Sequence, residues 1–195
     1  MFANTILHIS TNMALLLVEA VSSTSFKINP TAAKVLDAIK NPICVVSVAG
    51  RYRCGKSFII NRLLEDGKNA FNVGHTTNAC TKGIWMYGVP EERRIGGQKV
   101  TVVYLDTEGL DSMEADPSYD AKIFMLSLVL SSLFIYNSMN SIDEPSLERL
   151  ALVINLMKQL THDKDNDGTA DNKTATAAAD LLWLIRDFHL DLVDQ

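Results

Sequence analysis

Residues 50–57 have the residue types and the spacing of a phosphate-binding loop. They read Gly-Arg-Tyr-Arg-Cys-Gly-Lys-Ser, which is a complete G-x-x-x-x-G-K-[ST] pattern. Its glycines let backbone N–H groups turn toward phosphate oxygens, its lysine reaches the β- and γ-phosphates, and its final hydroxyl can bind Mg²⁺. An apolar run at residues 43–49 precedes the loop, and apolar residues at helical spacing follow it at 58–64. Bound phosphates would therefore lie at a helix N-terminus, where free N–H groups favour anions.

A second element follows about fifty residues later, where Asp106 ends an apolar run at residues 100–105 and Gly109 comes three positions on. In phosphate-loop NTPases such an Asp acts on Mg²⁺, usually through water, and the Gly senses the terminal phosphate. A turn that merely contains Asp and Gly is the alternative. The distance from the phosphate loop favours the Mg²⁺ and phosphate roles.

Between these two elements, residues 74–85 form a polar, hydroxyl-rich segment that ends in a predicted strand. Such a segment is typical of a switch loop, in which a threonine hydroxyl binds Mg²⁺ and the threonine carbonyl faces the catalytic water. We assign this role to Thr81. A solvated threonine that caps a backbone N–H is the alternative.

A fourth element is Arg186-Asp187, which follows the apolar run 181–185. A carboxylate at a strand end can accept hydrogen bonds from both N1–H and N2–H₂ of guanine, whereas adenine offers no such pair. The N-K-x-D sequence that Ras-like GTPases use for this purpose is absent, because residues 172–175 read Asn-Lys-Thr-Ala. Taken alone, an Arg-Asp pair is also typical of an exposed ion pair.

The composition fits one α/β domain, with 195 residues of which 47% are hydrophobic and 21% charged. A net charge of −5 and the lack of a dense basic stripe argue against nucleic acid as a partner. Three cysteines without a C-x-x-C pair indicate reduced thiols, so we expect a cytoplasmic protein.

Neither apolar stretch of the sequence predicts a membrane segment. The N-terminal stretch to Val21 lacks a basic leading segment, which favours an ordinary strand over a signal peptide. The longest apolar run, residues 123–136, contains three serines and is shorter than the ~20 residues that a spanning helix needs. We expect a buried helix that passes into a strand.

Strand-like and helix-like segments alternate after the phosphate loop. We predict strands at 100–105, 132–136 and 181–185, and helices at 118–130 and 144–160. This alternation predicts an α/β fold with a doubly wound, mostly parallel sheet covered by helices on both faces. We further predict that a turn at Gly96-Gly97 closes a hairpin between a strand around 84–87 and residues 100–103.

Together these motifs resemble the guanylate-binding proteins of the dynamin superfamily, with atlastins as more distant relatives. The matching sequence words, in order, lie at residues 45–57, 81–86, 105–110, 130–138 and 186–188. The resemblance extends over nearly the whole chain from about Leu17. It implies a P-loop NTPase of the large GTPase class.

The resemblance also implies an activity, namely hydrolysis of GTP to GDP, and further to GMP in this family, with Mg²⁺ as the cofactor. It implies an arginine finger supplied in cis by the phosphate loop, which corresponds to Arg53, with Arg51 as the alternative. A cis arginine can stabilise the charge that develops on the transferred phosphoryl group. Glu108 would help to organise the attacking water, and a nucleotide-dependent homodimer would form through this domain.

The full set of expected site residues follows from the motifs and the resemblance. Arg53, Glu108 and Thr81 are the catalytic candidates, and Ser57, Thr81 and Asp106 would hold Mg²⁺, the last through water. The expected nucleotide-binding residues are Gly50, Arg51, Tyr52, Arg53, Cys54, Gly55, Lys56, Ser57, Phe58, Asp106, Gly109, Arg186 and Asp187.

Two features depart from the family pattern. Guanylate-binding proteins commonly have a serine two residues before the switch threonine, thought to help position the water, and this chain has Ala79. Asn78 or the Thr81 backbone are the alternatives for that role. The chain also stops eight residues after Asp187. We therefore expect residues 1–195 to be a C-terminally incomplete GTPase domain that lacks the guanine cap, the final sheet and helix elements and the helical domain, leaving an open sheet edge and an uncovered apolar face.

Two other functions remain open at this point. One is a truncated or degenerate nucleotide-binding or interaction module with little catalysis, which Ala79 and the short C-terminus favour. The other is a membrane-remodelling enzyme like the atlastins, which would need transmembrane or lipidated sequence that is not visible here.

Overall fold

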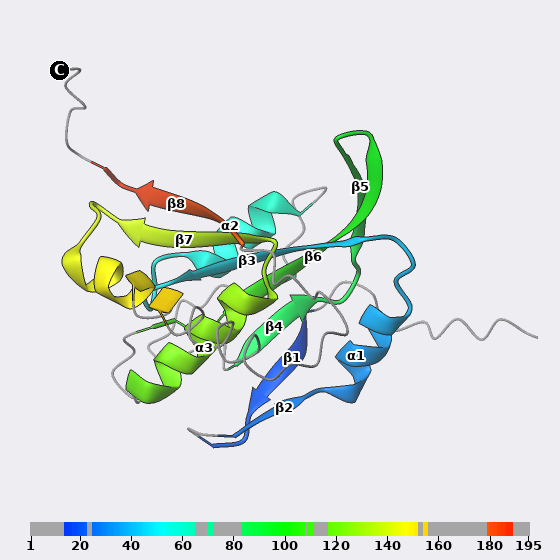
Figure 1. Cartoon of the computed structure of the whole chain (residues 1–195), viewed down its shortest axis with the longest axis horizontal. Coiled ribbons are helices and arrows are strands. Elements are labelled where there is room, and N and C mark those ends of the chain that lie inside the picture. Colours follow the sequence, from blue (N-terminus) through cyan, green and yellow to red (C-terminus); the bar gives the residue numbers. More distant parts are fainter. Residues whose placement is uncertain are drawn as a thin grey trace, which may run out of the picture.

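One eight-stranded sheet organises the chain in the computed structural model (Figure 1). The structure describes residues 14–22, 25–64, 70–71, 83–107, 109–110, 117–151, 154–155 and 179–188. The strands are β1 (Ala14–Ala20), β2 (Phe26–Ile28), β3 (Ile43–Gly50), β4 (Ile84–Tyr87), β5 (Glu91–Ile95), β6 (Gln98–Thr107), β7 (Leu133–Met139) and β8 (Asp180–Arg186). The helices are α1 (Pro30–Asp37), α2 (Lys56–Leu63) and α3 (Pro117–Leu130), and residues 144–151 and 154–155 are also helical.

The strand order is β2-β1-β4-β6-β3-β7-β8, and β5 pairs with β6 beside this path. Strands β6, β3, β7 and β8 run parallel, whereas β1, β2, β4 and β5 pair antiparallel with their neighbours. After β3 the chain reaches β6 on one side of β3, and it then crosses through α3 to β7 on the other side. This reversal is a topological switch point, and ligands of open α/β sheets bind at the carboxyl end of the strand where it occurs. The phosphate-loop sequence begins there.

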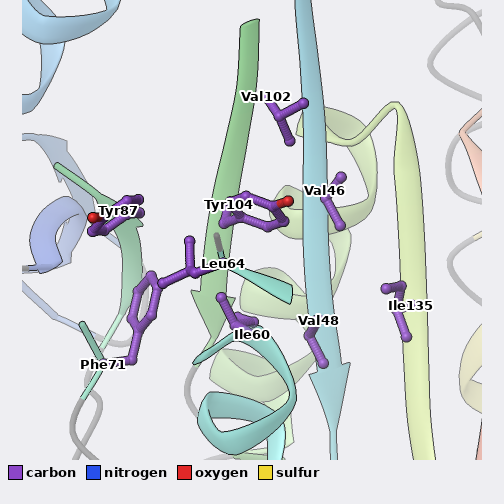
Figure 2. Close-up of a cluster of buried hydrophobic side chains, with 9 residues drawn as sticks. All are labelled: Val46, Val48, Ile60, Leu64, Phe71, Tyr87, Val102, Tyr104 and Ile135. Atoms are coloured by element: carbon purple, nitrogen blue, oxygen red, sulfur yellow. The ribbon is translucent and has the colours of Figure 1, made fainter. Parts of the chain in front are cut away.

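The central strands are apolar on both faces because helices cover both faces of the sheet. On one face, Val102 and Tyr104 pack with Ile60 of α2, in the cluster that Figure 2 shows. On the other face, Val103 of the same strand packs with Ile123 of α3. These alternating contacts confirm the predicted doubly wound α/β fold.

Most of the predicted elements are confirmed. The apolar N-terminal stretch contains β1, and the apolar run 43–49 corresponds to β3. The strands predicted at 100–105, 132–136 and 181–185 correspond to β6, β7 and β8. Helix α3 starts one residue before its predicted first position. The helix predicted at 144–160 is described only at 144–151 and 154–155.

The predicted hairpin is wrong in its first strand. The Gly96-Gly97 turn joins β5, not β4, to β6. Strand β5 reads Glu-Glu-Arg-Arg-Ile, and this charged sequence did not indicate a strand. These charges are tolerated because, in the described part of the chain, β5 pairs with β6 alone, and Arg93 forms an ion pair with Glu91 at 2.9 Å. Figure 1 shows this hairpin standing out from the sheet.

Two findings on the described residues bear on the expected open sheet edge and on the expected lack of a membrane segment. Strand β8 pairs only with β7 among them, and Leu181 and Leu182 on this strand are about half exposed. No helix in the described ranges combines the length and the apolar character needed to cross a membrane.

Replacing Ile60 tests the packing of α2 against the sheet. Its side chain is completely buried in the cluster of Figure 2. Ile60→Ala should lower the free energy of unfolding by about 2 to 5 kcal/mol, because it leaves a cavity in the core. Leu63→Ala, on the exposed side of the same helix, should cost less than about 1 kcal/mol. Urea denaturation followed by circular dichroism measures both, and equal losses would contradict the packing.

Candidate functional site

The phosphate-loop sequence forms a tight turn between β3 and α2. Gly50 has a φ of 154°, Arg53 of 63° and Gly55 of 88°. At Gly50 a Cβ atom would lie 2.2 Å from the carbonyl oxygen of Asn137, so only glycine fits there. Helix α2 begins at Lys56, and the N–H groups of its first turn have no acceptor within the helix. This geometry presents backbone donors at a helix N-terminus, as an anion site requires.

Lys56 lies between the loop and the segment that follows β6. Its Nζ donates a hydrogen bond to the Arg51 carbonyl oxygen at 3.0 Å, and the residue is only 6% exposed. A Cβ atom on Gly109 would lie 3.0 Å from that Nζ and 2.6 Å from Tyr52 Cα. The structure therefore brings Lys56 and Gly109 together, and only a residue without a side chain fits at position 109.

Backbone hydrogen bonds hold this contact in place. The Leu110 N–H donates to the Gly50 carbonyl at 3.1 Å, and the Tyr52 N–H donates to the Leu110 carbonyl at 2.7 Å. The segment that follows the acidic motif is thus attached to the N-terminal part of the phosphate loop.

Ser57 and Asp106 also meet at this edge of the sheet. The Ser57 hydroxyl donates to Asp106 Oδ2 at 2.5 Å, and Asp106 is 1% exposed. Burial raises the pKa of Asp106 to about 6, although the Ser57 hydrogen bond, the Lys56 charge and the Thr107 N–H act in the opposite direction. Asp106 Oδ1 is buried without a hydrogen-bond partner among the described residues.

This pair has the chemistry of a site for a hard divalent cation. Hydroxyl and carboxylate oxygens are ligands that Mg²⁺ prefers, directly or through water. A buried carboxylate with an oxygen that lacks a partner also gains from a nearby cation. Ser57 and Asp106 therefore fit Mg²⁺. Thr81, the third predicted ligand, lies outside the described residues.

A residue that the sequence did not identify, Asn137 at the carboxyl end of β7, also contacts the loop. It is fully buried, and its Nδ2 donates to the Cys54 carbonyl at 2.7 Å. Arg186 Nη1, from the end of β8, donates to the same oxygen at 3.1 Å. The sequence does show an amide side chain at the carboxyl end of a predicted strand. That position could have indicated a site residue, because ligands of α/β sheets bind at such strand ends.

The two arginines of the loop differ in their surroundings. The Arg51 guanidinium lies 3.8 Å from Asp143, in the segment after β7, and its side chain is 60% exposed. The Arg53 guanidinium lies 5.5 Å from the centre of the Tyr52 ring, and its backbone is in the left-handed region. Arg53 therefore lies at a position of left-handed backbone within the turn, whereas Arg51 faces a neighbouring segment.

The remaining predicted residues lie at the same edge or outside the described chain. Phe58 is 42% exposed, with its ring 5.8 Å from the Arg186 guanidinium carbon. Asp187 is exposed, follows β8 directly and has a φ of 52°, a conformation that Asp adopts more readily than most residues. Glu108, Ala79 and Asn78, like Thr81, lie outside the described residues.

The raised pKa of Asp106 predicts a pH-dependent stability. In the unfolded chain this group has its ordinary pKa near 3.8, so the stability that its neutral form provides is complete below that pH and is lost as the pH rises through about 6. The loss at neutral pH is on the order of 3 kcal/mol. In metal-free buffer, Asp106→Asn should therefore be more stable than the parent at pH 8, and this advantage should shrink toward pH 4.

Asp143 provides a control of opposite sign. Hydrogen bonds from Ser146 lower the pKa of Asp143, so its contribution is present above the ordinary pKa and is lost on acidification. Asp143→Asn should be less stable than the parent at pH 8 and nearly as much less stable at pH 4, because this contribution is lost only as the pH falls below 3.8 toward the lowered pKa. Denaturation midpoints of the three proteins at both pH values measure this, and an Asp106→Asn advantage that does not depend on pH would contradict the prediction.

Comparison with known proteins agrees with this geometry. The family model described as "Guanylate-binding protein, N-terminal domain" matches residues 23–195. Guanylate-binding protein 2 of Homo sapiens is 39% identical over 172 residues, which is 85% of this chain and 28% of the relative. Guanylate-binding protein 5 of Mus musculus is 41% identical over 172 residues, 84% of this chain and 28% of the relative.

A third relative gives the same result. Guanylate-binding protein 1 of Chlorocebus aethiops is 39% identical over 169 residues, 85% of this chain and 28% of the relative. The chain thus spans 28% of the length of each of these three relatives. The family model matches most of the chain, so the chain belongs to the guanylate-binding protein family, and the matched part corresponds to the N-terminal domain of that family.

Proposed function

We propose that this chain binds GTP together with Mg²⁺ and hydrolyses GTP to GDP. The observation that carries the proposal is the meeting of Lys56, Gly109 and the Ser57–Asp106 pair at the carboxyl end of β3 and β6. These residues come from two separate motifs. Around one helix N-terminus they supply the positively charged Lys56 amine, the Gly109 N–H as a backbone donor, and the Ser57 and Asp106 oxygens as metal ligands. The name of the relatives, guanylate-binding protein, supports guanine as the base.

The binding roles follow from the chemistry of each group. Backbone N–H groups of residues 50–57 and the Lys56 amine would bind the phosphates, and the Gly109 N–H would contact the terminal one. Ser57 and Asp106 would hold Mg²⁺, with Thr81 as the proposed third ligand. The metal, when bound, neutralises charge on the β- and γ-phosphates. The partial positive charge at the start of α2 adds to this stabilisation.

We assign the catalytic roles to Arg53 and Glu108. An arginine at the bend of the phosphate loop can direct its guanidinium at the transferred phosphoryl group, where charge develops in the transition state. Arg51 is the weaker candidate because its guanidinium faces Asp143 at 3.8 Å. Glu108, next to Gly109, would organise the attacking water through hydrogen bonds.

Two extensions belong to the same proposal. Further hydrolysis to GMP and a nucleotide-dependent homodimer through this domain are implied by the family resemblance. In such a dimer, contact between copies would help to place Arg53. The competing function is a nucleotide-binding module with little catalysis, which Ala79 favours because it has no hydroxyl to offer the attacking water.

Variants of Lys56 and Arg53 should separate binding from catalysis. Lys56→Ala should abolish detectable binding of GTP and GDP, since it removes the buried amine from the phosphate loop. Arg53→Ala should lower turnover at least about tenfold and change GTP affinity much less, because a finger acts mainly on charge present in the transition state. Fluorescent-nucleotide titration measures affinity, and single-turnover hydrolysis with Mg²⁺ measures the rate.

The hydrolysis assay should be run at several protein concentrations, because a dimer that places Arg53 makes specific activity rise with concentration. Unchanged GTP affinity in Lys56→Ala would overturn the phosphate-loop assignment. Tight GTP binding combined with equal turnover by the parent and Arg53→Ala would leave only the nucleotide-binding module.

Asp187 should determine the preference for guanine. Its exposed carboxylate at the end of β8 can accept from two guanine donors, and an unpaired donor costs about 1 to 3 kcal/mol. The parent should therefore prefer GTP to ATP, and Asp187→Asn should weaken that preference. Competition of both nucleotides against one fluorescent probe measures the ratio, and equal competition by ATP and GTP in the parent would contradict guanine recognition.

A further inference from the structure

We infer that Arg186 is a positioning residue of the phosphate loop. Its guanidinium, at the end of β8, orients the peptide between Cys54 and Gly55 so that the Gly55 N–H faces the bound phosphates. Because Asp187 is the next residue, the same strand end would serve both base recognition and phosphate recognition. This inference rests on the proposed nucleotide binding and adds a specific residue to it.

The contact itself joins two distant parts of the chain. Arg186 Nη1 donates to the Cys54 carbonyl oxygen at 3.1 Å, and Asn137 Nδ2 donates to the same oxygen at 2.7 Å. The two donors come from β8 and β7, which are neighbouring parallel strands. One loop carbonyl is therefore held by two side chains at the carboxyl edge of the sheet.

The direction of this carbonyl fixes the direction of an N–H group. No peptide bond in the described ranges is cis, and in a trans peptide the C=O and the following N–H point in opposite directions. With the Cys54 carbonyl directed at Arg186 and Asn137, the Gly55 N–H points away from both strands. Backbone N–H groups of such a loop are the donors that cradle phosphates, so the arginine holds one of these donors in its binding orientation.

The second glycine of the motif makes room for the arginine. A Cβ atom at Gly55 would lie 2.2 Å from Arg186 Nη1, and the φ of 88° also disfavours other residues there. Any side chain at this position would displace the guanidinium from the Cys54 carbonyl. Gly55 thus allows both the tight turn and the approach of Arg186.

Other contacts hold Arg186 in place. Its guanidinium carbon lies 5.8 Å from the centre of the Phe58 ring, within the range of a cation–π contact. Its backbone carbonyl accepts a hydrogen bond from the Asn140 N–H at 2.8 Å. A hydrogen bond from a charged guanidinium is also stronger than one from a neutral amide. Arg186 therefore adds a charge-assisted hydrogen bond to the one that Asn137 donates to the same carbonyl.

The affinities for GMP and GDP provide a test, because the two ligands share a base and differ in the β-phosphate. Gly55 directly precedes Lys56, whose amine reaches the β-phosphate. Loss of the Gly55 orientation should therefore lower the affinity for GDP more than the affinity for GMP. Arg186→Ala should lower GDP affinity at least about tenfold and GMP affinity less than about threefold. Arg186→Lys, which keeps the charge but not the planar fork, should give an intermediate GDP-to-GMP ratio.

Two control variants separate this role from others. Asp187→Asn should lower both affinities by a similar factor and leave the GDP-to-GMP ratio unchanged, since it acts on the base. Arg62→Ala removes another arginine that faces the Phe58 ring, at 5.0 Å, and should also leave the ratio unchanged. Thermal denaturation of each variant shows whether the fold is kept, and if Arg186→Ala does not fold, Arg186→Lys decides.

The outcomes distinguish the inference from the proposed function. A parent chain that binds neither GDP nor GMP overturns the proposed function itself. Binding by the parent, with an unchanged GDP-to-GMP ratio in the Arg186 variants, overturns only the positioning role. Equal losses of GDP and GMP affinity would assign Arg186 to the base and would likewise contradict the inference.

Discussion

The buried carboxylate of Asp106 is the constraint on which the candidate site depends. It is 1% exposed at the end of β6, and it is tied to the first turn of α2 through the Ser57 hydroxyl at 2.5 Å. Burial of a carboxylate is unfavourable unless charge or hydrogen bonds compensate for it. The sheet therefore carries a destabilising group at the point where β3 and β6 end. A cation bound there would offset this cost, so the same carboxylate that weakens the fold would strengthen the proposed binding of Mg²⁺.

The parallel pairing of the central strands brings the motifs to this point. Val48 of β3 lies opposite Asp106 of β6, and Gly50 of β3 lies opposite Asn137 of β7. Since parallel strands share one carboxyl edge, groups that are 49 to 132 positions apart in the chain gather around one loop. Helix α2 then covers the sheet from the same loop, which connects core packing to the placement of Lys56.

The sequence predicted what depends on local pattern. The phosphate loop has its own spacing, and the central strands are apolar on both faces because both faces are buried. Strand β5 was missed because four of its five residues are charged, and such a sequence is stable as a strand only on the flank of a sheet. Asn137 and the Arg186 contact were missed for a different reason. A hydrogen bond between positions 132 residues apart depends on strand order and register, and neither is visible in the spacing of one motif.

With nucleotide bound as proposed, the position of β8 would link base recognition to phosphate recognition. In the described part of the chain this strand pairs only with β7, and its placement also depends on Trp183, which donates to the Ser138 hydroxyl at 2.9 Å and packs its ring against Tyr136. Arg186 adds a contact with the phosphate loop at the end of the same strand. By linkage, a ligand that orders the loop stabilises the strand end, and a ligand that holds the strand end stabilises the loop by the same free energy. In a nucleotide that contacts both the loop and the strand end, each contact would therefore contribute more binding free energy than the same contact made by a fragment of the nucleotide.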